Sequence, residues 1–173
     1  MLLHTEKFSK IKKYALMSLM LAAGIVLQWV DGFLSIGVPG GKLGLANVVS
    51  VLNLYLFGAK NALFVAVLRA FLGSVLCGGI SSVPYSVCGA VSSVLVMAVA
   101  KKYFSPYLSE IGISVCGACV HNLAQIAVAC VVFENASVAS YGSVLILVGT
   151  ASGVLTGITA AELNKKLFRY KIN

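Results

Sequence analysis

The chain has 173 residues, of which 13 are Lys or Arg and only five are Asp or Glu, so its formal net charge is +8. Hydrophobic residues make up 60% of it, and the mean hydropathy is +0.98. So few charges cannot cover the surface of a water-soluble globular protein of this length. The composition therefore excludes that class and predicts an integral membrane protein.

Apolar stretches recur along the whole chain, and a hydrocarbon core of about 30 Å takes roughly 20 apolar helical residues to cross. We predict six transmembrane helices at about 14–30, 43–57, 61–79, 84–100, 111–133 and 141–163, of which the second is short. Together they use most of the sequence. The predicted fold is therefore an all-α, polytopic membrane protein with a single membrane domain over residues 1–173.

The basic residues alternate with the predicted spans. Four lysines precede the first span, Lys60 follows the second, two lysines follow the fourth, and four basic residues follow the sixth. If the chain crosses six times, all of these lie on one side, and the other side receives Lys42, Asp31 and Glu134. This positive-inside pattern predicts a cell-membrane protein with both termini in the cytoplasm. The basic charge thus indicates topology, and no nucleic-acid partner is expected.

Small residues follow one face of two predicted spans. On the first span they are Ala15, Ser18 and Ala22, and this stripe fits either packing within the protein or contact with an external helix. On the sixth span they recur every four positions: Gly149, Gly153, Gly157 and Ala161. Such spacing lets two helix backbones approach closely. For the sixth span we expect packing within the chain.

Arg69 lies in the middle of the third span, where a charge costs roughly 2.5–3.5 kcal/mol on insertion scales. A helix rises about 1.5 Å per residue, so the position of a residue along its span gives its depth in the bilayer. On this basis Arg69 lies near the midplane, and other polar residues lie in the outer half of the bilayer. The residues around Arg69 at helical spacing are mostly small, which leaves space for water or a ligand. The predicted substrate-binding residues are Lys42, Asn47, Arg69, His121, Asn122 and Gln125.

Two roles for Arg69 remain open at this stage. Lys42 and Arg69 outnumber the acids within reach, since only Asp31 lies near them, and this favours an anionic or strongly electron-rich ligand. In the alternative, Arg69 bonds backbone carbonyls and the side chains of Asn122 and Gln125, and serves only to fix the register of the helices.

Signatures of catalysis and metal binding are weak. Cys116-x-x-Cys119 with His121 resembles half a zinc site, but no second ligand pair has matching spacing, so no metal is predicted. The chain has a single aspartate and no Gly-rich nucleotide loop, so we predict neither an enzyme nor a cofactor. All five cysteines lie in or beside spans, and pairing of Cys77 with Cys88 is left open.

Several segments resemble the Gx transporter family, which is often labelled heptaprenyl diphosphate synthase component I. They are Pro39 to Asn47 (PGGKLGLAN), Leu68-Arg69 through Gly73 with Gly78-Gly79, and Gly117 through Gln125 with its HNLAQ sequence. The resemblance covers nearly the whole chain. It implies a relation to the substrate-binding S-components of energy-coupling-factor (ECF) transporters. Those are six-helix membrane proteins driven by a transmembrane coupling protein and two cytoplasmic ATPases.

The resemblance also implies roles for particular positions. S-components commonly contact the coupling protein through an AxxxA-like face of helix one, and Ser18-x-x-x-Ala22, with Ala15, is the nearest match. The outer loop at about 31–42 would correspond to the substrate gate. Membrane lipid and a small-molecule substrate complete the expected partners.

The predicted function is therefore capture of a small vitamin-like, anionic or aromatic compound for an ATP-driven importer. Flavin-like, quinone-precursor and prenyl-phosphate compounds all fit. One alternative is a membrane accessory subunit for prenyl diphosphate synthesis or prenyl-lipid handling, although the acidic residues that hold Mg²⁺ on a diphosphate are missing. A self-sufficient secondary transporter or channel is the other.

Overall fold

The computed structural model describes residues 2–33 and 44–172, and this part of the chain is helical without any strand. Its six α-helices are α1 (Leu2–Phe33), α2 (Asn47–Phe57), α3 (Ala59–Cys77), α4 (Val83–Phe104), α5 (Glu110–Val132) and α6 (Gly142–Ile172). Two short 3-10 helices, η1 (Ile80–Ser82) and η2 (Ala136–Tyr141), precede α4 and α6. The all-α prediction is confirmed.

Within the described residues, five helices are long and apolar enough to cross a membrane, and the predicted count of six is not confirmed. The exception is α2, whose 11 residues rise only about 16 Å. The sequence prediction began this span at residue 43, but Gly44 has a φ of +68°. That left-handed conformation cannot continue a right-handed helix, so the helix starts only at Asn47.

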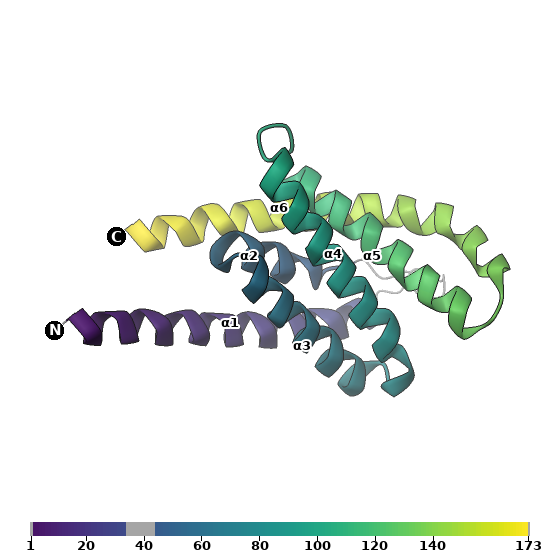
Figure 1. Ribbon diagram of the computed structural model, residues 1–173, viewed down its shortest axis with the longest axis horizontal. Coiled ribbons are helices and arrows are strands. Elements are labelled where there is room, and N and C mark those ends of the chain that lie inside the picture. Colours follow the sequence, from purple (N-terminus) through teal and green to yellow (C-terminus); the bar gives the residue numbers. More distant parts are fainter. Residues whose placement is uncertain (1, 34–43, 173) are drawn as a thin grey trace.

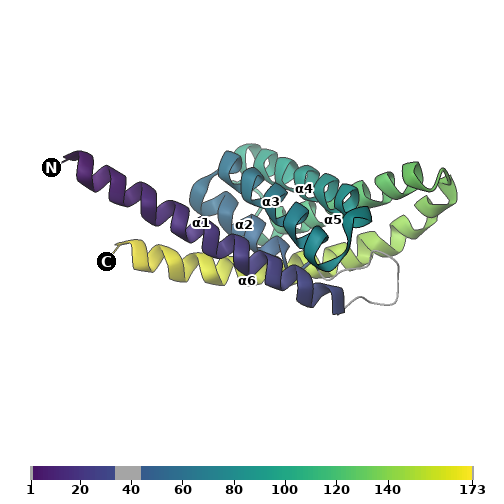
Figure 2. The same cartoon turned by 90° about the horizontal axis from the view of Figure 1, so that it is seen from below.

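The helices form a bundle in which the two ends of the chain lie at the same end of the molecule (Figures 1 and 2). At this end α1 and α6 extend past the other helices (Figure 1). Helix α3 packs on α1 and α4, α4 packs on α5, and α5 packs on α6. The short helix α2 contacts the five other α-helices, and every residue from Asn47 to Leu54 is buried.

The glycine stripe of α6 packs within the chain, as predicted, and its partner is α5. A Cβ atom on Gly153 would lie 2.7 Å from the Cα atom of Val115, and one on Gly157 would lie 2.7 Å from the Cα atom of Ile111. The two backbones are therefore in direct contact. A buried 2.9 Å hydrogen bond between the hydroxyls of Ser114 and Thr156 joins the same two helices.

The end of α2 is tied to the end of α4. The ammonium group of Lys101 donates a 3.0 Å hydrogen bond to the carbonyl of Leu54, one of the last carbonyls of α2, and lies 4.1 Å from the centre of the Tyr55 ring. The last carbonyls of a helix lack partners within it. The Asn61 side chain satisfies another by donating to the carbonyl of Phe57 at 2.6 Å.

Replacing Lys101 with Met should lower the free energy of unfolding by about 1–2 kcal/mol, because a hydrogen bond from a charged donor is lost. The expected result is a lower midpoint of thermal unfolding in detergent. Lys102→Met is the matched control, since Lys102 is exposed and its ammonium lies only over the neighbouring Tyr103 ring. Equal losses in both variants would show that the contact with Leu54 contributes nothing specific.

Candidate functional site

A cavity inside the bundle is lined mainly by polar and small residues from all six helices. Five of the six predicted substrate-binding residues line it: Asn47, Arg69, His121, Asn122 and Gln125. The sixth, Lys42, lies outside the described residues, as does most of the predicted 31–42 loop. The other lining residues are Gln28, Asp31, Gly44, Ala46, Ala70, Ser86, Ala118 and Ser152. We name this the Arg69 cavity.

The Arg69 cavity is narrow. Its volume is about 30 Å³, which leaves room for about two water-sized groups at roughly 10–15 Å³ each. Its walls come from helices that are otherwise apolar. Polar groups that converge among apolar helices make this cavity a candidate binding site, although its volume lies far below the roughly 300–1,000 Å³ of the usual ligand pocket.

Arg69 is buried, with 3% of its surface exposed. Its Nη1 atom donates a 3.2 Å hydrogen bond to Oε1 of Gln28 on α1. Its Nε and Nη2 atoms are also buried, and neither has a hydrogen-bond partner. The sequence-based alternative named Asn122 and Gln125 as structural partners of Arg69. The recorded partner is instead Gln28, and the amide of Asn122 donates to the carbonyl of Leu145 at 2.7 Å.

Glycines on neighbouring helices make room for the polar side chains of the site. A Cβ on Gly24 would lie 2.6 Å from Cδ of Arg69, so α1 passes directly beside the arginine. Each of three further glycines would place a Cβ within 2.9 Å of a polar side chain: Gly73 at Gln28, Gly89 at His121 and Gly149 at Asn122. We call these four the glycine contacts. At each of them a Cβ atom would force the facing polar side chain to shift.

Helix α2 begins at the Arg69 cavity, where Gly44, Ala46 and Asn47 form part of the lining. No side chain caps this N-terminus, although the backbone N–H groups of Asn47 and Val48 donate to the carbonyls of Gly44 and Leu45. A helix N-terminus carries a partial positive charge, which adds to the charge of Arg69. Asp31, which is 2% exposed, supplies one carboxylate at the same cavity and offsets part of this positive charge.

Sequence reasoning missed several residues of the site. Gln28, Ser86 and Ser152 were given no role in the predicted site. A lone serine on a helix gives no sequence signal that separates a lining position from ordinary packing. Asn53, which is also buried, lies apart from the cavity and donates to the carbonyl of Val49 one turn earlier.

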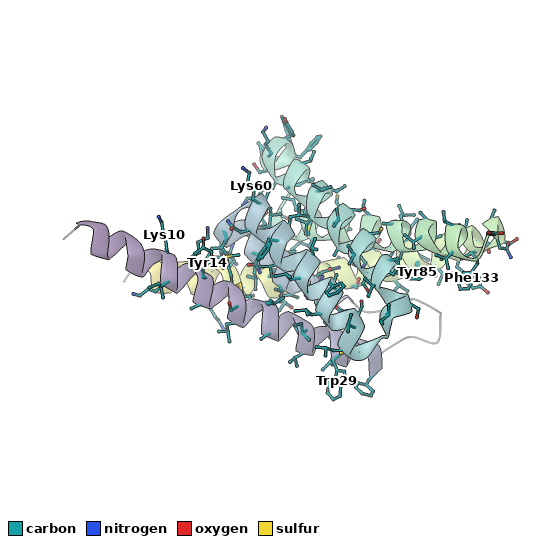
Figure 3. The ribbon with its side chains drawn as sticks, turned by 60° about the horizontal axis from the view of Figure 1, so that its bottom comes forward. Lys10, Tyr14, Trp29, Lys60, Tyr85 and Phe133 are labelled. Carbon is teal, nitrogen blue, oxygen red and sulfur yellow. The ribbon has the colours of Figure 1, made fainter. Side chains whose placement is uncertain are left out.

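A second cavity, of about 180 Å³, lies beside the first and shares Gln28 with it. It is lined by Gln28, Trp29, Gly32, Phe33, Gly73, Ser74, Cys77, Gly78 and Ser82. The rings of Trp29 and Phe33 meet edge to face at 4.8 Å, near the end of α1 opposite Lys10 (Figure 3). The hydroxyl of Ser74 is buried without a hydrogen-bond partner. We name this the Trp29 cavity.

All five cysteines are free thiols, and Cys77 and Cys88, whose pairing was left open, are both exposed. Sγ of Cys119 lies 3.5 Å from the Thr150 hydroxyl. No group of three or more His, Cys, Asp or Glu side chains placed to hold a metal ion occurs in the described part of the chain.

Five apolar helices of spanning length, packed around a polar cavity, define the chain as a polytopic α-helical membrane protein. The family model described as heptaprenyl diphosphate synthase component I matches residues 20–163, which include every residue named above as lining either cavity. The chain belongs to this family, the Gx transporter family, as its sequence segments indicated. Comparison with curated proteins and with solved structures gave no match.

Proposed function

We propose that the chain is the substrate-binding S-component of an ECF-type importer for a small vitamin-like, anionic or aromatic compound. The observation that carries this proposal is the Arg69 cavity, where a buried guanidinium keeps two N–H-bearing atoms without partners. A charged donor buried among apolar helices is costly unless something binds it. A captured ligand supplies that partner.

The surface of α1 supports the second part of the proposal, which is contact with a coupling protein. Ala15, Ser18 and Ala22 are all exposed, so this stripe is not used for packing within the chain. Small residues on an exposed face let a partner helix approach closely within the membrane. In this proposal the protein lies in the cell membrane with both termini in the cytoplasm, where two ATPases drive the coupling protein.

The runner-up is a membrane accessory subunit for prenyl diphosphate synthesis or prenyl-lipid handling, which the family description suggests. Binding a diphosphate through Mg²⁺ relies on carboxylate ligands. Asp31 is the single carboxylate among the described residues that line the Arg69 cavity. This residue set favours direct recognition of a ligand by Arg69 over metal-assisted diphosphate chemistry, so we place the transport role first and propose no catalytic role.

Affinity purification of the tagged chain in mild detergent, followed by mass spectrometry of proteins and small molecules, tests the proposal. We expect a transmembrane coupling protein and two ATPases in the purified complex. Recovery of a soluble prenyl synthase without ATPases would instead support the accessory subunit. Flux through liposomes that contain this chain alone would support a self-sufficient transporter or channel.

A further inference from the structure

The guanidinium of Arg69 has one edge engaged and one edge open. Its Nη1 atom donates to Gln28, whereas Nε and Nη2 are buried and have no partner. In a planar guanidinium, Nε and Nη2 lie on the same edge and present two parallel N–H bonds. That pair matches the two oxygens of a carboxylate or of a phosphate group. The open edge therefore selects a ligand group with two neighbouring acceptor oxygens.

The volume of the Arg69 cavity indicates which of the two groups, carboxylate or phosphate, fits it better. A volume of about 30 Å³ holds about two water-sized groups, which fits the two oxygens of a carboxylate. A phosphate brings additional oxygens, each of which needs its own space and donors. The uncapped N-terminus of α2 opens on the same cavity and favours negative charge there. The geometry thus favours a carboxylate.

The Trp29 cavity offers space for the rest of such a ligand. Gln28 lines both cavities, so its side chain lies between them, and a ligand that contacts both must lie against that side chain. The volume of about 180 Å³ exceeds the roughly 150 Å³ of an engineered apolar cavity, in another protein, that binds benzene. Trp29 and Phe33 provide aromatic surface, and the unpartnered hydroxyl of Ser74 provides one polar contact.

We propose that the ligand of this protein is an aromatic monocarboxylate. Its carboxylate binds the Nε–Nη2 edge of Arg69, and its ring occupies the Trp29 cavity beside Gln28. This assignment deepens the proposed transport function, on which it rests for the ligand's role as cargo. Binding itself requires only this chain.

The test is isothermal titration of the purified full chain in detergent with benzoate, its neutral analogue benzamide, acetate and inorganic phosphate. Benzoate should bind at least about tenfold more tightly than benzamide, because the amide has no negative charge and keeps only one acceptor oxygen, while its NH2 group is a donor and cannot accept from the second N–H. Acetate should bind weakly, since it leaves the ring cavity empty. Phosphate binding as tight as that of benzoate would overturn the assignment of a carboxylate.

Two variants test the binding of the carboxylate and of the ring separately. Arg69→Gln should weaken both benzoate and acetate, with a loss of about 10- to 100-fold for benzoate. Gly32→Leu places a side chain at the Trp29 cavity, where a Cβ on Gly32 meets nothing within 4 Å. It should weaken benzoate and leave acetate unchanged. Ala23→Leu, on an exposed position of α1 that lines neither cavity, is the matched control.

If Arg69→Gln does not fold, Arg69→Lys replaces it, because lysine keeps the charge but loses the paired N–H edge. Unchanged benzoate affinity in the folded Arg69 variant would overturn the role of the arginine, and unchanged affinity in Gly32→Leu would overturn the position of the ring. The titrations contain no ATPase, so a negative result would overturn the ligand assignment without overturning the importer proposal. The affinity purification tests the importer proposal separately. Benzoate binding without recovered ATPases would leave a carboxylate-binding protein of another class.

Discussion

Gly153→Leu is expected to lower the free energy of unfolding by about 3 kcal/mol or more, at or beyond the upper end of the usual cost of overpacking. The reason is the closeness of α5, because a Cβ at this position would lie 2.7 Å from the Cα atom of Val115. A backbone atom cannot rotate away as a flexible side chain can. The two helices must separate, and the Ser114–Thr156 hydrogen bond is stretched or broken with them.

Detergent-solubilised protein, heated and then passed over a size-exclusion column, gives the midpoint at which the folded peak is lost. Ala151→Leu is the matched control, since Ala151 lies two residues away on the exposed side of α6. Its midpoint should stay close to that of the unmodified chain. If Gly153→Leu and Ala151→Leu behave alike, the close approach of α5 and α6 does not stabilise the fold.

If the chain is the S-component of an importer as proposed, Ala22→Leu should abolish co-purification of the coupling protein and its ATPases while leaving the proposed benzoate binding unchanged. Ala22 is exposed on the stripe that also holds Ala15 and Ser18, and it lines neither cavity. A leucine there holds a partner helix away from the small-residue face, and the van der Waals packing that joins helices in a membrane falls steeply with separation. Transport should be lost together with the partner.

Ala23→Leu makes the same change at the next position, which faces about 100° further round the helix and is also exposed. It should retain the partner proteins. Loss of the partner in both variants would indicate a general effect of bulk on α1. Retention in both would place the coupling face elsewhere on the protein.

Much of the Arg69 cavity could be predicted from sequence, because depth along a helix and the face of a helix are both regular functions of residue number. Arg69, His121 and Gln125 line one cavity for this reason, since the predicted depths and faces of their helices brought them together. The glycine stripe of α6 was predictable on the same grounds, and its contact with α5 confirms it.

Features that depend on how two helices cross were not predictable. The partnership of Arg69 with Gln28 joins residues 41 positions apart, and it follows from the packing of α1 on α3. The Trp29 cavity arises where the ends of these helices meet near η1, and no periodicity in one segment indicates it. The length of α2 was overestimated because Gly44, read as one more apolar residue, turns the backbone.

The glycine contacts have a consequence for how this site can diversify. Each polar side chain and its facing glycine belong to different helices, as Arg69 of α3 and Gly24 of α1 do. A larger residue at the glycine requires the facing polar side chain to move or to shorten at the same time. Specificity in this family is therefore expected to change by double replacement across a helix pair, and such positions should covary when related chains that recognise different ligands are aligned.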